Sequence, residues 1–167
     1  MDMADKLNKL EDLFVDSLKD LYDAEHQITQ ALPKMIDAAK SQELKKGFKD
    51  HLEMTRRQSD RLEQIFKEMK MEPKAKKCVG MQGLIKEGEE VMREAEDPDV
   101  RDAALIASAQ KIEHYEISGY GTARAYAEAL GHPSIAKVLD QILEEESNTD
   151  EKLTRLAESH INAKAIR

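Results

Sequence analysis

The sequence contains few of the residues from which sheets, turns and disulfide frameworks are built. It has no Trp, seven Gly, four Pro and only 4% aromatic residues among its 167 positions. Because strands are enriched in aromatic residues and a sheet needs many turns, this composition argues against a sheet protein. Cys78 is the only cysteine, which excludes an internal disulfide and is typical of proteins in a reducing cytosol. We therefore expect an all-α, cytoplasmic protein.

Long apolar runs and blocks of positive charge are missing as well. No stretch approaches the roughly 20 apolar residues of a membrane-spanning helix, and the acidic, amphipathic start MDMADKLNKLEDL does not have the pattern of a signal peptide. The formal net charge is −8, with Lys and Arg distributed among the acidic residues, so that phosphate backbones are repelled. We expect neither a membrane nor a nucleic acid as a partner.

What the sequence does contain is helical periodicity along nearly its whole length. Apolar residues recur every three or four positions, which predicts a single helical domain over residues 1–167. The expected helices are 4–39, 41–69, 81–95, 98–130 and 134–160. The four longer ones form two hairpins with short loops, and a long connection between the hairpins carries the short helix. This is the wiring of a four-helix bundle with a long crossover, which ferritin-like folds use.

Five polar residues occupy positions where the bundle core is expected. When residues are placed at about 100° intervals around each helix, these five lie on or interrupt the apolar stripes. Counting about 1.5 Å per residue from the hairpin turns puts all of them near the middle of the bundle, within about one or two helical turns of each other. The five residues are Glu25, His51, Glu113, Glu116 and Glu146.

Carboxylates buried together must be protonated, paired with cations or bound to metal, because their desolvation and mutual repulsion are costly. No Lys or Arg shares their stripes, and Arg124 at the edge is the nearest basic candidate. Any one of these residues alone could be an ordinary hydrogen-bonded core residue or half of an ion pair. Their convergence at one depth favours a dinuclear metal site. Oxygen ligands with one imidazole suit iron, the metal we expect, and also manganese, the second candidate. Glu145, Asp150 and His114 flank the stripes and are expected beside the ligands.

Four segments resemble the bacterial YciF/YciE stress-response family, a ferritin-like family long described as a domain of unknown function. They are LYDAEHQITQALPKM, HLEMTRRQSDRLEQIF, VRDAALIASAQKIEHYEISGYGTARAYAEALG and LEEESNTDEKLTRLA, and the resemblance runs from about Leu7 to Ala157. It implies a ferritin-like bundle, a rubrerythrin-like di-metal centre and a homodimer. The positions that match the metal ligands are Glu25 in AEHQ, His51 in HLE, Glu113 and Glu116 in EHYE, and Glu146 in LEEE.

The sequence departs from the family pattern at the proposed site. The usual di-iron pattern places Glu-x-x-His on two helices, and here it is found on neither 41–69 nor 134–160. Family members often read HLEET where this chain reads HLEMT, so Met54 replaces a carboxylate. A thioether is a poor ligand for Fe²⁺ or Mn²⁺, and we expect one metal position to be weaker than the other.

Two classes of function are compatible with these residues. The first is a stress-response protein whose di-iron or di-manganese site reacts with peroxide or dioxygen, and the alternative is a metal-binding or structural stress protein without turnover. A storage shell would need cage-forming surfaces, and DNA protection is opposed by the acidic charge. The substrate, and whether there is turnover at all, stay open at this stage.

Overall fold

The computed structural model describes residues 6–166, and every regular element in that range is helical. This confirms the expected all-α class. The elements are α1 (Leu10–Ala38), α2 (Gln42–Glu68), α3 (Val79–Glu94), α4 (Pro98–Ala129), α5 (Pro133–Leu156), a π-helical segment (Ala157–Ile161) and α6 (Asn162–Ala165).

The first helix begins later than the periodicity predicts. Residues 6–9 are not helical, and residues 4 and 5, which were expected to open the helix, lie outside the described part of the chain. The carboxylate of Asp12 accepts hydrogen bonds from the backbone N–H groups of Asn8 and Lys9, at 3.0 and 3.1 Å. Because this carboxylate satisfies two N–H groups that precede the first turn, the helix begins at Leu10.

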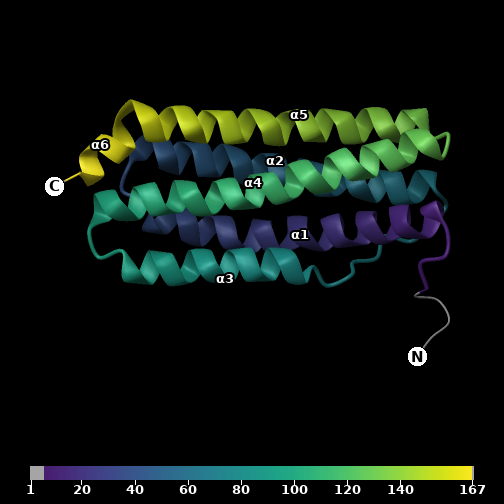
Figure 1. Cartoon of the computed structure of the whole chain (residues 1–167), viewed down its shortest axis with the longest axis horizontal. Helices are drawn as coiled ribbons and strands as arrows, with labels where there is room; N and C mark the ends of the chain where they lie inside the picture. The colour runs from purple at the N-terminus through teal and green to yellow at the C-terminus, as the bar shows by residue number, and fades with distance from the viewer. Residues whose placement is uncertain (1–5, 167) are drawn as a thin grey trace.

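The last helix also differs from the expectation of one unbroken helix to residue 160. α5 ends at Leu156 and continues into the π-helical segment, in which Ile161 is buried. At this end the chain bends away from the line of α5 toward α4, as the yellow segment in Figure 1 shows. The burial of Ile161 against the core accounts for the bend better than any local sequence signal does.

The two hairpin turns are fixed by different local features. Ser41 Oγ accepts a hydrogen bond from the backbone N–H of Leu44 and caps α2. The carboxylate of Asp102 on α4 accepts hydrogen bonds from the backbone N–H groups of Lys40 and Ser41, at 2.7 and 2.8 Å, and so ties the α1–α2 turn to α4. At the other turn Gly131 has φ +77°, a left-handed conformation that suits glycine, and Pro133 opens α5.

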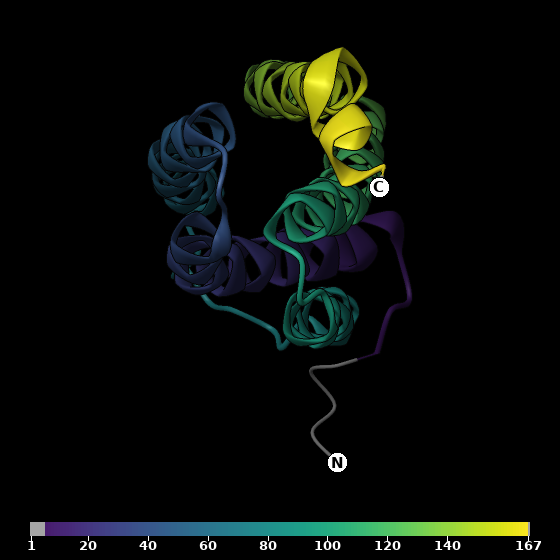
Figure 2. The ribbon, with the colours of Figure 1, turned by 90° about the vertical axis from the view of Figure 1, so that its left-hand side faces the viewer.

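Four long helices, α1, α2, α4 and α5, run along the long axis of the molecule, and α3 packs on the outside against α1 and α4 (Figure 1). The view along this axis shows the four long helices arranged around a common interior (Figure 2). α2 and α5 are antiparallel, because α2 begins at the end of the molecule where α5 finishes. None of the described helices is both long and apolar enough to span a membrane.

The apolar core between these helices is divided into two clusters. One contains Ile28, Phe48 and Leu153, and the other contains Leu21 and Leu62 together with further residues from the opposite end. Along each long helix, the predicted polar residues lie between members of the two clusters. The core is interrupted at the depth where the sequence places its inward-facing carboxylates.

Candidate metal centre

All five residues singled out by their helical positions are buried. Glu25, Glu113, Glu116 and Glu146 have 0% exposure, and His51 has 4%. Each long helix contributes at least one of them, with α4 contributing two. Since a charged carboxylate is seldom buried without a partner, their complete burial requires a chemical explanation.

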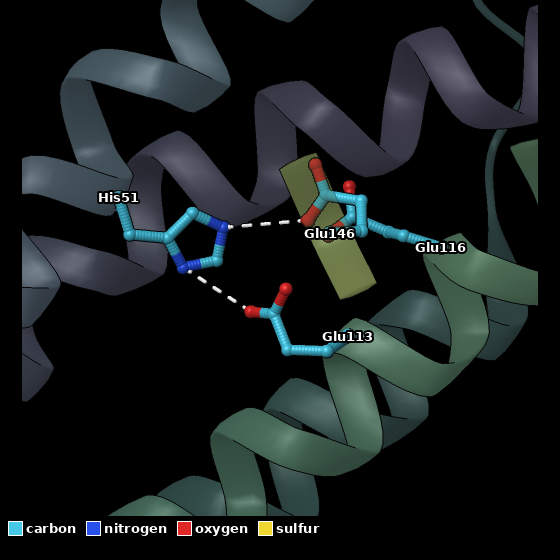
Figure 3. A group of neighbouring side chains, drawn as sticks. All are labelled: His51, Glu113, Glu116 and Glu146. Atoms are coloured by element: carbon cyan, nitrogen blue, oxygen red, sulfur yellow. Dashed lines mark ion pairs between the residues drawn. The ribbon is translucent and has the colours of Figure 1, made fainter. Parts of the chain in front are cut away.

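Four of the five residues converge on one point. His51, Glu113, Glu116 and Glu146 each offer one ligand atom, and these four atoms lie within 4.8 Å of one another. In Figure 3 the imidazole of His51 faces the carboxylates, with Nδ1 3.2 Å from Glu113 Oε1 and Nε2 3.8 Å from Glu146 Oε2. Ligands of one ion at about 2.0–2.6 Å are separated by at most about 5 Å, so the group has the dimensions of a metal site.

Glu25 lies beside this group of four and is not part of it. Its Oε1 accepts a hydrogen bond from the hydroxyl of Tyr120, which is also fully buried, and its Oε2 has no hydrogen-bond partner. The carboxyl of Glu25 is nevertheless close enough to Glu116 and Glu146 for each to change its pKa. The structure therefore brings all five predicted residues to one buried region, with Glu25 at its edge.

The electrostatics of the cluster disfavour ionised carboxylates in the metal-free protein. Burial, followed by the charge of Glu146, raises the pKa of Glu113 and Glu116 well above the usual range. The same two causes raise the pKa of Glu25 to about 8, and burial raises that of Glu146. Burial lowers the pKa of His51 to about 4, which keeps its imidazole neutral, the form that binds metal.

Most polar atoms of the cluster lack hydrogen-bond partners. An unsatisfied buried polar atom costs about 1–3 kcal/mol, so a group of them at one place is unusual in a folded core. A divalent cation would satisfy these atoms and offset the repulsion between the carboxylates, so the residues present fit a metal ion. The unpaired atoms are Glu25 Oε2, His51 Nε2, both carboxylate oxygens of Glu113 and of Glu116, and Glu146 Oε2.

Polar side chains around the cluster contact its members, and the sequence analysis named only some of them. Gln58 Nε2 donates to Glu146 Oε1 and, at 3.0 Å, to Glu145 Oε2, while Arg61 pairs with Glu145. Gln58 interrupts the apolar stripe of α2, which was a usable signal. The positive charge that lowers the pKa of Glu25 comes from Arg61.

Arg124, the basic residue expected nearest to the cluster, pairs with two other carboxylates, 2.9 Å from Glu128 and 3.4 Å from Asp140. On the other side of the cluster, Asp150 accepts a hydrogen bond from Gln110 at 3.1 Å and lies 3.3 Å from His114. The negative charge of Asp150 raises the pKa of Glu113. Asp150 and Glu145 thus lie next to the cluster, as expected.

Met54 lies outside the group of four and lines a cleft that His51 also borders. We expect one of two metal positions to bind weakly because Met54 stands where relatives often have Glu. Met54→Glu should then raise the metal-to-protein ratio or tighten the second binding step. Anaerobic calorimetric titration with Fe²⁺ or Mn²⁺ measures both quantities. Asn148→Glu adds the same charge to the same cleft from α5 and serves as the control. Two equal sites in the wild type, unchanged by Met54→Glu, would exclude position 54 from the site.

Together, the helical fold and the buried group of carboxylates and imidazole define an all-α protein with a polar centre suited to a metal ion. The family described as a domain of unknown function, DUF892, matches residues 9–166, and the chain belongs to this family. Protein YciF of Escherichia coli (strain K12) is 48% identical over 160 residues, which cover 95% of this chain and 96% of that protein. The resemblance to the YciF stress-protein family is thereby confirmed.

Solved structures of relatives have the same fold. The crystal structure of the E. coli stress protein YciF is 47% identical, covers 93% of this chain and 99% of its own, and has a TM-score of 0.89. YcfI from Rhodopseudomonas palustris, described as a proposed structural protein, is 46% identical over 89% of this chain and 95% of its own, with a TM-score of 0.88. A protein from Xanthomonas campestris pv. campestris, 22% identical over 93% of this chain and 95% of its own, shares the fold with a TM-score of 0.74.

Proposed function

We propose that this protein is a single-domain, ferritin-like metalloprotein of the stress response, whose four-helix bundle holds two metal ions and reacts with peroxide or dioxygen. Iron is the metal we favour, and manganese is the second candidate. The observation that carries this proposal is the convergence of four fully or nearly fully buried ligand residues within 4.8 Å, most of whose polar atoms have no hydrogen-bond partner. The long connection from α2 to α4, with α3 inside it, supports the ferritin-like wiring.

The group of four would hold one ion, and Glu25, which lies beside it with its hydroxyl partner Tyr120, would help to hold a second. His51 lies 3.2 Å from Glu113 and 3.8 Å from Glu146 within the group of four. Burial, and then the charges of Glu146, Glu25 and Glu113, raise the pKa of Glu116, so its carboxylate lies near three other carboxylates and would be among the residues that hold the metal. A bound ferrous pair would supply two electrons for the reduction of a peroxide. The protein excludes bulk water and keeps His51 neutral.

The second candidate is a metal-binding or structural protein without turnover. It is favoured by the 0% exposure of the four carboxylates, which limits direct contact with solvent, and by the description of YcfI as a structural protein. In this case metal bound only by the folded state would stabilise the chain by mass action. We place either form in the cytoplasm as a homodimer, in line with the single cysteine and the family resemblance.

Metal content and peroxide turnover decide between the two candidates. Protein purified without chelator should contain up to two iron or manganese ions per chain, and the ferrous form should be oxidised by hydrogen peroxide faster than free Fe²⁺. Elemental analysis and stopped-flow absorbance measure these quantities. Full metal content without accelerated oxidation would support the metal-binding form of the second candidate, and protein that binds no metal after anaerobic loading would leave only its structural form.

A further inference from the structure

A cleft of about 450 Å³ lies between α2 and α5, and His51 forms part of its wall. The view along the bundle shows these two helices set apart from each other (Figure 2). On the α2 side the wall includes Phe48, His51 and Met54, and on the α5 side Thr149 and Leu153. The cleft therefore ends next to the carboxylate cluster.

His51 is the member of the cluster that this cleft reaches. It retains 4% exposure where Glu113, Glu116 and Glu146 have none, and its Nε2 has no hydrogen-bond partner. Glu25 is bonded to the buried hydroxyl of Tyr120, and Gln58, which joins Glu146 to Glu145, lies outside the lining of the cleft. A molecule in the cleft would thus approach the cluster past the imidazole.

The buried side chains at one end of the cleft are apolar. Because α2 and α5 are antiparallel, Leu44 and Phe48 near the start of α2 lie opposite Leu153 and Leu156 near the end of α5, and the charged residues that also line this end, Glu43, Asp50 and Lys152, are exposed. At the other end the cleft is lined by polar residues, among them Arg57, Asn148 and Glu145. His51 lies between the apolar and the polar part, so an occupant with an apolar body and a polar end would place its polar end at the imidazole.

We propose that this cleft is the reactant site of the cluster and that its reactant is a small organic hydroperoxide. This rests on the proposed function, since the cluster must hold the reducing metal. The volume falls in the range of about 300–1,000 Å³ typical of pockets for organic ligands and exceeds what hydrogen peroxide or dioxygen needs. A hydroperoxide is uncharged at neutral pH, so its polar end can approach the carboxylates without the repulsion that an anion would meet.

The reaction is a two-electron reduction of the peroxide. The O–O bond breaks, the hydroperoxide ROOH takes up two electrons and two protons, and the products are the alcohol ROH and water. Two ferrous ions, when held by the carboxylates and His51, would supply one electron each, and the two protons would come from water. The apolar residues of the cleft hold the R group throughout, and His51 marks the point at which the oxygen atoms meet the cluster.

Binding of an unreactive product tests the cleft without any metal. 2-Phenyl-2-propanol, the alcohol formed from cumene hydroperoxide, should bind the metal-free protein saturably and shift the backbone NMR signals of residues 43–57 and 145–156. Leu156→Trp fills the apolar end and should weaken binding about ten-fold. Ile85→Trp, a matched change in a half-buried residue of another cavity, should not. Absence of saturable binding, or shifts confined to other regions, would overturn the proposal.

Reaction kinetics test the preference for an organic reactant. In ferrous-loaded protein, Leu156→Trp should slow oxidation by cumene hydroperoxide about ten-fold and leave oxidation by hydrogen peroxide unchanged. Equal slowing of both peroxides, or of neither, would refute the assignment. Leu156→Phe, a smaller change at the same position, provides the same test if Leu156→Trp does not fold. If the wild type reacts with neither peroxide, the proposed function fails, whereas saturable alcohol binding would still identify the cleft as a site for organic molecules.

Discussion

Glu116→Gln should abolish most metal binding, whereas Glu53→Gln should leave it unchanged. Glu116 is fully buried, both of its carboxylate oxygens lack hydrogen-bond partners, and the charges of Glu146, Glu25 and Glu113 all act on it. Substitution of a residue that only supports a metal ligand typically lowers metal affinity about 10–100-fold. Loss of a residue that itself binds the metal should lower the affinity at least as much. Elemental analysis after anaerobic loading with Fe²⁺ or Mn²⁺ and desalting measures the effect.

The control residue Glu53 is exposed on the same helix as His51, so the two substitutions remove the same group from different environments. Gln has nearly the shape of a protonated Glu, and the metal-free Glu116→Gln protein should be at least as stable as the wild type. Thermal unfolding in the presence of a chelator verifies that the variant is folded. Equal metal content in the two variants would rule out the proposed site.

The metal-free protein should lose stability as the pH rises from about 6.5 to 8. The folded-state pKa of Glu25 is raised from 4.5 to about 8, so between these values the folded chain binds more protons than the unfolded chain. Stability falls with pH wherever the folded state holds more protons, by up to about 1.4 kcal/mol per pH unit for each such group. Glu113, Glu116 and Glu146 act in the same direction.

His51 has the opposite effect at lower pH. Its folded-state pKa is lowered from 6.5 to about 4, so stability rises with pH across that range and partly cancels the carboxyl effect. Above pH 6.5 only the carboxyl contribution persists, which makes this the informative window. Urea unfolding at intervals between pH 6.5 and 8, in the presence of a chelator, measures the slope.

Saturating Mn²⁺ should remove or reverse this dependence, because metal binds the deprotonated ligands and its affinity grows as they lose protons. At about 100 times its dissociation constant the ion should add about 2.7 kcal/mol of stability. The Glu116→Gln protein should show a smaller slope than the wild type without metal and little response to Mn²⁺. A metal-free stability that is flat or rising from pH 6.5 to 8 would contradict the electrostatic account of the cluster.

Much of the fold follows from local signals in the sequence. The helices expected to begin at residues 98 and 41 begin in the structure at residues 98 and 42, where Asp97 and Ser41 cap them. The late start at Leu10 was missed because it depends on one carboxylate, that of Asp12, turning back to preceding backbone N–H groups. The π-helical segment was missed because the burial of Ile161 against other helices, rather than local propensity, accounts for it.

The sequence by itself determined which residues face the interior. The helical period fixes the side of each helix on which a residue lies, and equal distances from two short turns fix its depth, so Glu25, Glu113, Glu116 and Glu146 were all placed in the core correctly. That these residues bind metal stays a prediction. The periodicity could not show whether Glu25 belongs to the group of four or lies beside it, because Glu25 has the same helix face and the same depth in both cases.

Only the tertiary structure decided how the inward residues are paired. The contact of Tyr120 with Glu25, of Gln58 with Glu146 and of Arg61 with Glu145 each joins two helices, and depends on side-chain rotamers and on the distance between helix axes. The cleft beside His51 likewise exists because α2 and α5 stand apart along one stretch. A pattern along one helix specifies a direction, whereas a site or a cleft requires distances between helices, and these arise only when the whole bundle packs.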